Sequence, residues 1–181
     1  MKTYKIIEPI GYGLYTALKD GKSGVVTDNG GMILPFEYDS IGGFDGELFT
    51  VCKDDKWGYV NNKNELIIDF KFAFAFTFSE GLAPACLDFW DTGMGYIDKK
   101  GDFVIKPAYK DAGLFDNGIA VVSVAHKTPE GVVIRYGVIN KTGEFIIQPL
   151  YKQIKIKDDY IICHRGFLKK KRYFDFSGNK M

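Results

Sequence analysis

The chain has 181 residues, of which 46% are hydrophobic and 15% aromatic, and its formal net charge is +1. This length suits one ordered domain that buries roughly 70% of its unfolded surface. The small net charge argues against a domain that binds polyanions over its whole surface, and the absence of any run of about 18 apolar residues predicts no transmembrane helix.

The N-terminus and the cysteines bear on location. "MKTYKIIEPIGYGLY" has no long apolar run before Glu8, so we predict no signal peptide. The three cysteines have no C-x-x-C spacing, and this predicts neither a disulfide framework nor a zinc site. Cys52 and Cys86 take the same place in adjacent repeats, so we expect them to be small buried thiols. A reducing cytoplasm is the expected compartment.

The chain is a repeat. "KWGYVNNKNELII" (56–68) aligns without a gap with "GMGYIDKKGDFVI" (93–105) and "RYGVINKTGEFII" (135–147). In chain order, we predict a single domain over 1–181, made of a half-repeat, four repeats and a second half-repeat: 4–21, 22–55, 56–92, 93–134, 135–165 and 171–181. A unit of this size cannot bury an apolar face alone, so neighbouring units must stack.

Each repeat predicts three β-strands. Two runs rich in Val, Ile, Phe and Tyr flank a polar turn such as "NNKN" or "DKKG", and a third run follows an F-x-x-G turn. The turn opens with Asp, Asn or Thr, whose side chain can accept a backbone hydrogen bond. Its fourth position suits a left-handed residue, and it holds Gly30, Asn64, Gly101, Gly143 and Gly178. No window has a helical period, so the fold class is all-β, with about five antiparallel three-stranded units of ~35 residues.

A glycine recurs inside the first strand of four repeats. It is Gly24, Gly58, Gly95 and Gly137, and Arg172 takes the place in the last copy. Because glycine weakens a strand interior, its recurrence indicates a close approach by a neighbouring backbone or ring. The preceding Trp57 is replaced elsewhere by Ser23, Met94, Tyr136 and Lys171, which predicts a partly exposed position.

These units resemble the WG-repeat (KWG repeat) family of bacterial repeat proteins. The resemblance rests on "KWGYVNNKNELI", "GYIDKKGDFVIKPAYKDAGLFDNGIAVV" and "YGVINKTGEFIIQPLY", although a literal Trp-Gly pair occurs once. It implies a β-repeat interaction module without catalysis.

Two arrangements of the units stay open. One is a small closed, propeller-like ring, in which the two half-repeats complete one unit and residues 4–18 lie beside residues 171–181. The other is an open, curved β-array. The split ends slightly favour the ring because closure would cover both exposed strand edges. Against the ring, propeller blades usually have four strands and these units predict three.

The favoured function is the binding of a protein or peptide partner. Extra residues lengthen two repeats at 87–93 and 125–134, and insertions at equivalent loops emerge on one face, often the binding face. Phe89 and Trp90 are either an exposed aromatic anchor or a local core plug. The candidate binding residues are Phe89, Trp90, Trp57, Tyr59 and His126.

Two alternative functions stay open. The basic segment 164–172 suits nucleic acid or another polyanion, through Arg165, Lys169, Lys170, Lys171 and Arg172, although lysines also protect a strand edge. The second alternative is carbohydrate binding or hydrolysis at an aromatic cleft. No catalytic motif, metal-ligand spacing or cofactor loop is recognisable, so we expect no enzyme activity, metal or cofactor. We make no prediction of the oligomeric state from the sequence.

Overall fold

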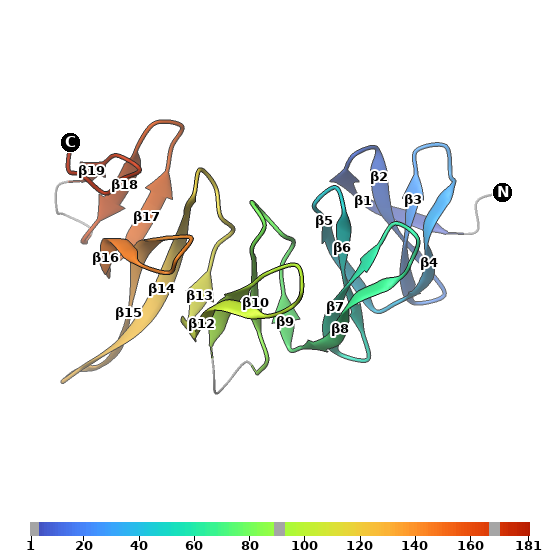
Figure 1. The fold of residues 1–181 in the computed structure, drawn as a ribbon, viewed down its shortest axis with the longest axis horizontal. Helices are drawn as coiled ribbons and strands as arrows, with labels where there is room; N and C mark the ends of the chain where they lie inside the picture. Colours follow the sequence, from blue (N-terminus) through green and yellow to red (C-terminus); the bar gives the residue numbers. More distant parts are fainter. Residues whose placement is uncertain (1–3, 89–92, 167–170) are drawn as a thin grey trace.

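The structure is a computed structural model that describes residues 4–88, 93–166 and 171–181. These residues form five antiparallel sheets that follow one another along the chain (Figure 1). Within each sheet, strands adjacent in sequence are adjacent in space, as in a simple meander. Within the described ranges, no helix is long and apolar enough to cross a lipid bilayer.

The first three sheets take up the chain as far as Tyr109. Sheet 1 contains β1 (Lys5–Gly11), β2 (Leu14–Lys19), β3 (Lys22–Thr27) and β4 (Met32–Tyr38). Sheet 2 contains β5 (Ser40–Phe44), β6 (Leu48–Lys53), β7 (Lys56–Asn61) and β8 (Leu66–Phe72). Sheet 3 contains β9 (Phe74–Ala75), β10 (Ala83–Cys86), β11 (Met94–Ile97) and β12 (Phe103–Tyr109).

The last two sheets continue the series. Sheet 4 contains β13 (Asp111–Ala112), β14 (Ile119–Thr128), β15 (Gly131–Asn140) and β16 (Phe145–Tyr151). Sheet 5 contains β17 (Gln153–Ile156), β18 (Ile161–His164) and β19 (Arg172–Phe174).

Four of the five sheets have four strands, where the sequence predicted three. The additional strand is the first of each sheet, and it can be short: β9 and β13 have two residues each. Such a segment is too brief to show an alternating apolar pattern. A sequence repeat therefore runs across two sheets, so that residues 22–55 supply β3 and β4 to sheet 1 and β5 and β6 to sheet 2.

The recurrent glycine marks a bulge between the third and fourth strands. In sheet 2 the pairing jumps from Trp57 opposite Phe72 to Tyr59 opposite Ile68, so three residues of β8 lie opposite the single Gly58. A Cβ on Gly58 would lie 2.6 Å from the carbonyl oxygen of Ile68. Equivalent carbonyl oxygens would crowd a Cβ at Gly24, Gly95 and Gly137. The expected close backbone approach is confirmed.

The polar turns have the expected chemistry. Asn61 Oδ1 accepts hydrogen bonds from the backbone N–H groups of Lys63 and Glu65, at 2.9 and 3.0 Å. The fourth position is left-handed throughout, with φ of 63° at Asn64 and 84° at Gly101. Gly101 also needs the absence of a Cβ, because that atom would lie 2.6 Å from the Ile68 side chain of the preceding sheet.

The hydrophobic core is divided into four clusters, each lying between two successive sheets. One cluster joins Tyr59 and Phe72 of sheet 2 to Phe78 and Ile97 of sheet 3. The other three join sheets 1 and 2, 3 and 4, and 4 and 5. Each sheet thus buries its faces against its neighbours, as the size of the repeat required.

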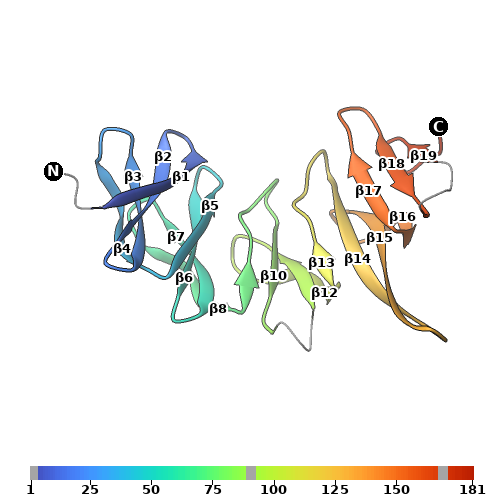
Figure 2. The ribbon, with the colours of Figure 1, turned by 180° about the vertical axis from the view of Figure 1, so that it is seen from behind.

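The array is open, and the expectation that the ends complete a ring is wrong. The chain ends lie at opposite ends of the long axis in both views (Figures 1 and 2). Among the described residues, β1 pairs with β2, and β19 pairs with β18. Residues 4–18 therefore do not lie beside residues 171–181, and the alternative of an open, curved array holds.

Candidate partner-binding face

The two ends of the strands form two different edges of the array. The turn edge, at the top in Figure 1, holds the turns between first and second and between third and fourth strands. The loop edge, at the opposite ends of the strands, holds the connections between second and third strands and the links from sheet to sheet. Both insertions that the sequence shows, at 87–93 and 125–134, are connections between second and third strands.

On the turn edge, charged side chains form ion pairs between neighbouring sheets. Lys99, in the β11–β12 turn, forms ion pairs with Asp45 and Glu47 in the β5–β6 turn of the preceding sheet. One sheet later, Lys141 repeats this contact with Glu80, at 3.0 Å. These lysines and carboxylates are thus already engaged with one another.

Connections on the loop edge differ in length. Sheets 1 and 2 use two-residue turns with positive φ, at Asp20-Gly21 and Asp54-Asp55. In sheet 3 the connection is residues 87–93. In sheet 4 strands β14 and β15 form a long hairpin, whose last paired residues are Thr128 and Gly131. Phe89 and Trp90 lie outside the described residues.

Trp57 is half-buried and packs against the next sheet. Its ring meets that of Phe74 edge-on, with centroids 5.5 Å apart, and Phe74 in turn meets Phe76 at 4.8 Å. Trp57 therefore fills the junction of sheets 2 and 3 on the side of the loop edge, while one part of its surface stays accessible.

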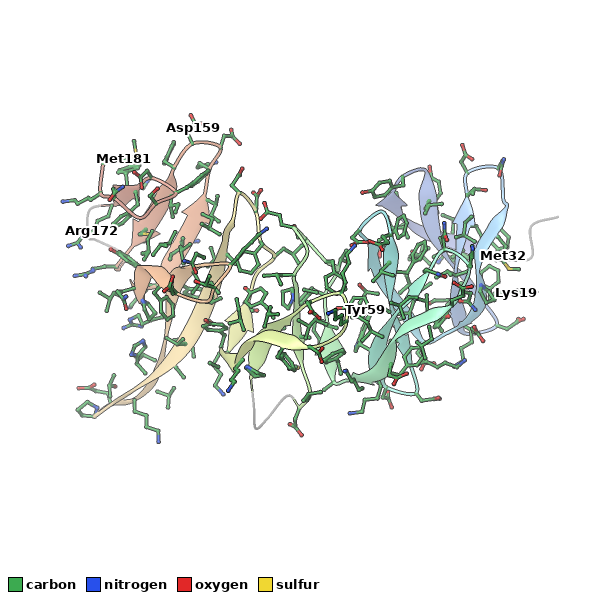
Figure 3. All side chains as sticks on the ribbon, viewed as in Figure 1. Lys19, Met32, Tyr59, Asp159, Arg172 and Met181 are labelled. Carbon is green, nitrogen blue, oxygen red and sulfur yellow. The ribbon has the colours of Figure 1, made fainter. Side chains whose placement is uncertain are left out.

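Tyr59 is wrongly assigned as a binding residue. Its side chain is 0% exposed, and its hydroxyl donates a hydrogen bond of 2.7 Å to the carbonyl oxygen of Phe76 across the junction (Figure 3). Burial raises the pKa of this phenol far above its ordinary value. Trp57 and Tyr59 are two residues apart in a strand that pairs regularly with β6, so both lie on the face toward sheet 3.

His126 is half-buried on the extended part of β14, opposite Val133. Its Nε2 atom is shielded from solvent and has no hydrogen-bond partner among the described residues. This histidine is therefore on the loop edge but does not present both ring nitrogens to a partner.

Two grooves open at junctions between sheets on the loop edge. The larger, which we call the 4/5 groove, has a volume of about 680 Å³ and is lined by Val121, Tyr136, Lys152, Gln153, Ile154, His164 and Gly166. The smaller, which we call the 3/4 pocket, has about 210 Å³, and its lining includes Phe74, Phe76, Met94 and Lys110. Tyr136 and Met94 hold the place that Trp57 holds in sheet 2.

The charge of the sheet-to-sheet link changes along the array. Between sheets 1 and 2 the link residue is Asp39, which binds Lys22 at 2.5 Å and accepts a hydrogen bond from the Asp54 backbone. The hydrogen bond from Lys22 holds the pKa of Asp39 below its ordinary value. At the last two junctions the equivalent residues are Lys110 and Lys152. Asp88 and Asp111 also line the 3/4 pocket beside Lys110, whereas the described lining of the 4/5 groove contains Lys152 and no carboxylate.

The basic segment is itself the connection between β18 and β19, at the loop-edge position of sheet 5. Arg165 lies over the ring of Tyr151, with its guanidinium carbon 5.6 Å from the ring centroid. Lys171 and Arg172 are exposed, and Lys169 and Lys170 fall outside the described residues (Figure 3). The two surfaces that the sequence offered as alternatives therefore adjoin the same edge.

The cysteines are buried as expected. Cys52, Cys86 and Cys163 are free thiols, and burial raises the pKa of Cys163 to about 11. A thiol with so high a pKa is a weak nucleophile at neutral pH. Among the described residues, no group of three or more His, Cys, Asp or Glu side chains is placed to hold a metal ion.

Sequence reasoning missed Tyr136, Lys152 and Gln153, which line the 4/5 groove. The signal for them was present in the repeat alignment. Tyr136 precedes the recurrent glycine of its copy, and Lys152 and Gln153 follow the Tyr of a P-x-Tyr sequence. The pairing of β15 with β16 sets Tyr136 opposite Tyr151 and so brings the two positions together.

Comparison with known proteins supports the repeat architecture. A sequence profile described as "WG containing repeat" matches residues 24–57, 57–88, 94–125 and 136–162, which is more than half of the chain. The chain belongs to the WG-repeat family. These four matches follow the repeat limits rather than the sheets, so each WG repeat joins the second half of one sheet to the first half of the next.

Two solved structures are similar to this WG-repeat chain. A crystal structure of a eukaryotic initiation factor has 10% identity and a TM-score of 0.57, covering 97% of this chain and 53% of that chain. Our chain thus spans about half the length of that protein, and the likeness shows the fold alone. A protein of unknown function from Bacteroides caccae has 13% identity and a TM-score of 0.42, covering 100% of this chain and 81% of that chain. No curated protein matches the chain significantly.

Proposed function

We propose that this WG-repeat chain is a non-catalytic interaction module that binds a protein partner through its loop edge. The observation that supports this most directly is the difference between the two edges at sheets 3 to 5. Ion pairs between sheets engage Lys99 and Lys141 on the turn edge. The ion pairs of the loop edge are at sheets 1 and 2, through Lys22 and Lys53, and farther along the array this edge carries the long connections and both grooves.

Aromatic side chains add to this proposal. Trp57, Phe74 and Phe76 form a continuous row of ring contacts beside the 3/4 pocket, and Phe76 is 38% exposed. Exposed aromatic groups next to a groove are the usual anchors of protein interfaces. This row of rings therefore offers a partner apolar contact area at the junction of sheets 2 and 3.

Site-specific photocrosslinking tests the proposed edge. A photoreactive amino acid replaces Val132, which is 63% exposed on the β14–β15 hairpin, and the chain is irradiated in the cells that produce it. The matched control places the same group at Lys100, which is exposed in a turn on the opposite edge. We expect discrete protein adducts from Val132 only; equal adducts from both positions would reject the loop edge as the binding face.

Polyanion binding is kept as a second candidate because Arg165, Lys171 and Arg172 adjoin the same edge. Binding to phosphates weakens steeply with salt. Retention on heparin at low salt that is lost in a variant with these three residues changed to Ala would favour this candidate. No retention at low salt would remove it.

A further inference from the structure

We propose that the 4/5 groove binds a short acidic segment of the protein partner. This inference rests on the proposed function, since it names the partner chemistry for one part of the loop edge. The groove volume of about 680 Å³ lies within the range of pockets that enclose ligands larger than single ions.

Charge at the groove is of one sign. Lys152 lines it and is exposed, and Arg165, which stands in the chain between the lining residues His164 and Gly166, lies over the Tyr151 ring. The groove lining contains no carboxylate. Within the described ranges, no carboxylate lies within ion-pair distance of either cation. An acidic ligand would therefore find cations that no described carboxylate of the chain neutralises.

The acidic residues of sheet 5 lie at the other end of its strands. Asp158 and Asp159 form the turn between β17 and β18, at the top in Figure 3, and Asp175 is in the turn after β19. The turn edge of this sheet also carries Lys157 and Lys180, so its charge is mixed, whereas the described charges of its loop edge, at Lys152, Arg165, Lys171 and Arg172, are all positive. Such a distribution favours an acidic ligand at the loop edge.

The junction of sheets 1 and 2 differs in charge from the junction of sheets 4 and 5, where the groove lies. The residue equivalent to Lys152 is Asp39, whose carboxylate is held by Lys22 and by the Asp54 backbone N–H. That junction supplies its own counter-charge. Among the residues described at the 4/5 groove the counter-charge is lacking, so the bound partner must supply it.

The lining favours a peptide over a nucleic acid. Val121, Ile154 and the ring of Tyr136 are apolar surface, and Gln153 offers an amide to a peptide backbone. Cations beside an apolar lining suit carboxylates that alternate with apolar side chains. A phosphate backbone is bound instead by a longer row of Lys and Arg.

Fluorescence anisotropy with the full chain tests the inference. The probe is a fluorescein-labelled peptide of Glu residues interrupted by Leu and Phe, and the comparison probes are the same peptide with Lys in place of Glu and an oligothymidylate of equal charge. We expect the Glu peptide to bind, the Lys peptide not to bind, and the oligothymidylate to bind more weakly. Added salt should weaken Glu-peptide binding.

Two charge-reversal variants locate the binding. Lys152→Glu should weaken Glu-peptide binding by about tenfold or more, because it places like charges together. Lys110→Glu, the matched control at the equivalent link one sheet earlier, should change it less than about threefold. Both side chains are exposed, so folding should be preserved, which circular dichroism checks.

Three results would overturn the inference: no binding of the Glu peptide, tighter binding of the oligothymidylate, or equal effects of the two variants. The photocrosslinking result is independent of all three. Crosslinked adducts at Val132 together with no Glu-peptide binding would retain the loop edge as the binding face and reject the acidic ligand.

Discussion

At the scale of single residues, the recurrent glycine sets how closely the third and fourth strands approach. The Cβ that Gly58→Ala adds would lie 2.6 Å from a backbone oxygen, which cannot rotate away. We expect a loss of about 2 kcal/mol in the free energy of unfolding, as for other overpacked sites. Urea denaturation measures it.

The control for that substitution is Gly166→Ala. Among the described residues, no atom lies within 4 Å of the position of its Cβ, and its φ is outside the left-handed region. We expect a change within about 0.5 kcal/mol. Similar losses in the two variants would contradict the close approach at the bulge as the cause of the effect at Gly58.

A second residue-scale prediction concerns the buried phenol between sheets 2 and 3. Tyr59→Phe leaves the carbonyl oxygen of Phe76 without this donor, so we expect thermal or urea denaturation to show a loss of about 1–2 kcal/mol. Tyr173→Phe is the matched control, since Tyr173 holds the equivalent place in sheet 5 and is 40% exposed. Equal stability of Tyr59→Phe and the wild type would contradict the structural role assigned to the hydroxyl.

At the scale of elements, turns hold neighbouring sheets together. Asp45 caps the β5–β6 turn, where its Oδ1 accepts hydrogen bonds from the Leu48 and Glu47 backbones at 2.7 and 2.9 Å, and its Oδ2 pairs with Lys99 at 3.0 Å. Burial acts to raise the pKa of this carboxyl, but the hydrogen bonds and Lys99 outweigh it, so its pKa lies below the ordinary value.

This depressed pKa predicts a loss of stability in acid. A carboxyl with a lowered folded-state pKa stabilises the fold fully above its unfolded pKa of about 3.9, and that contribution is lost as pH falls through the folded value. We expect the free energy of unfolding to fall less between neutral and acidic pH in Asp45→Asn than in the wild type. Urea denaturation at both pH values measures the difference.

The matched control is Asp158→Asn, at an exposed carboxylate in another turn between first and second strands. Its acid-induced loss of stability should equal that of the wild type. If the acid-induced loss of stability in Asp45→Asn also equalled that of the wild type, the Asp45–Lys99 ion pair between the turns of sheets 2 and 3 would have no part in acid unfolding.

At the scale of the whole molecule, each core cluster lies between two successive sheets. Stability should therefore be transmitted mainly between neighbours. Ile161→Ala creates a cavity between sheets 4 and 5, where Ile161 is fully buried, and we expect a loss of about 3 kcal/mol. Hydrogen exchange should increase in β15–β19 and remain nearly unchanged in β6 and β7.

Ile162→Ala serves as its control, because this half-buried residue on the same strand lies outside the cluster between sheets 4 and 5. Its effect on exchange should be smaller and confined to sheet 5. A uniform increase over all five sheets after Ile161→Ala would mean that the array unfolds as one cooperative unit.

Several features of this protein were determined by the sequence alone, because they depend on residues close together in the chain. The turn at Asn61, the left-handed Gly101 and the close approach at Gly58 are local, and each was predicted. The burial of Cys86 depends on packing against the next sheet, but its recurrence at an equivalent repeat position predicted it. The insertions at 87–93 and 125–134 were also placed at equivalent connections of the repeat.

Other features were decided only by the tertiary structure. Whether five sheets close depends on the twist between neighbours, a small angle that accumulates over the array and that no single repeat encodes. Tyr59 is buried because sheet 3 covers its face of β7, and the short β9 and β13 gain their strand form from pairing with longer neighbours. The 4/5 groove exists because residues of two different sheets, such as Tyr136 of sheet 4 and His164 of sheet 5, meet where the sheets stack, and only packing can bring them together.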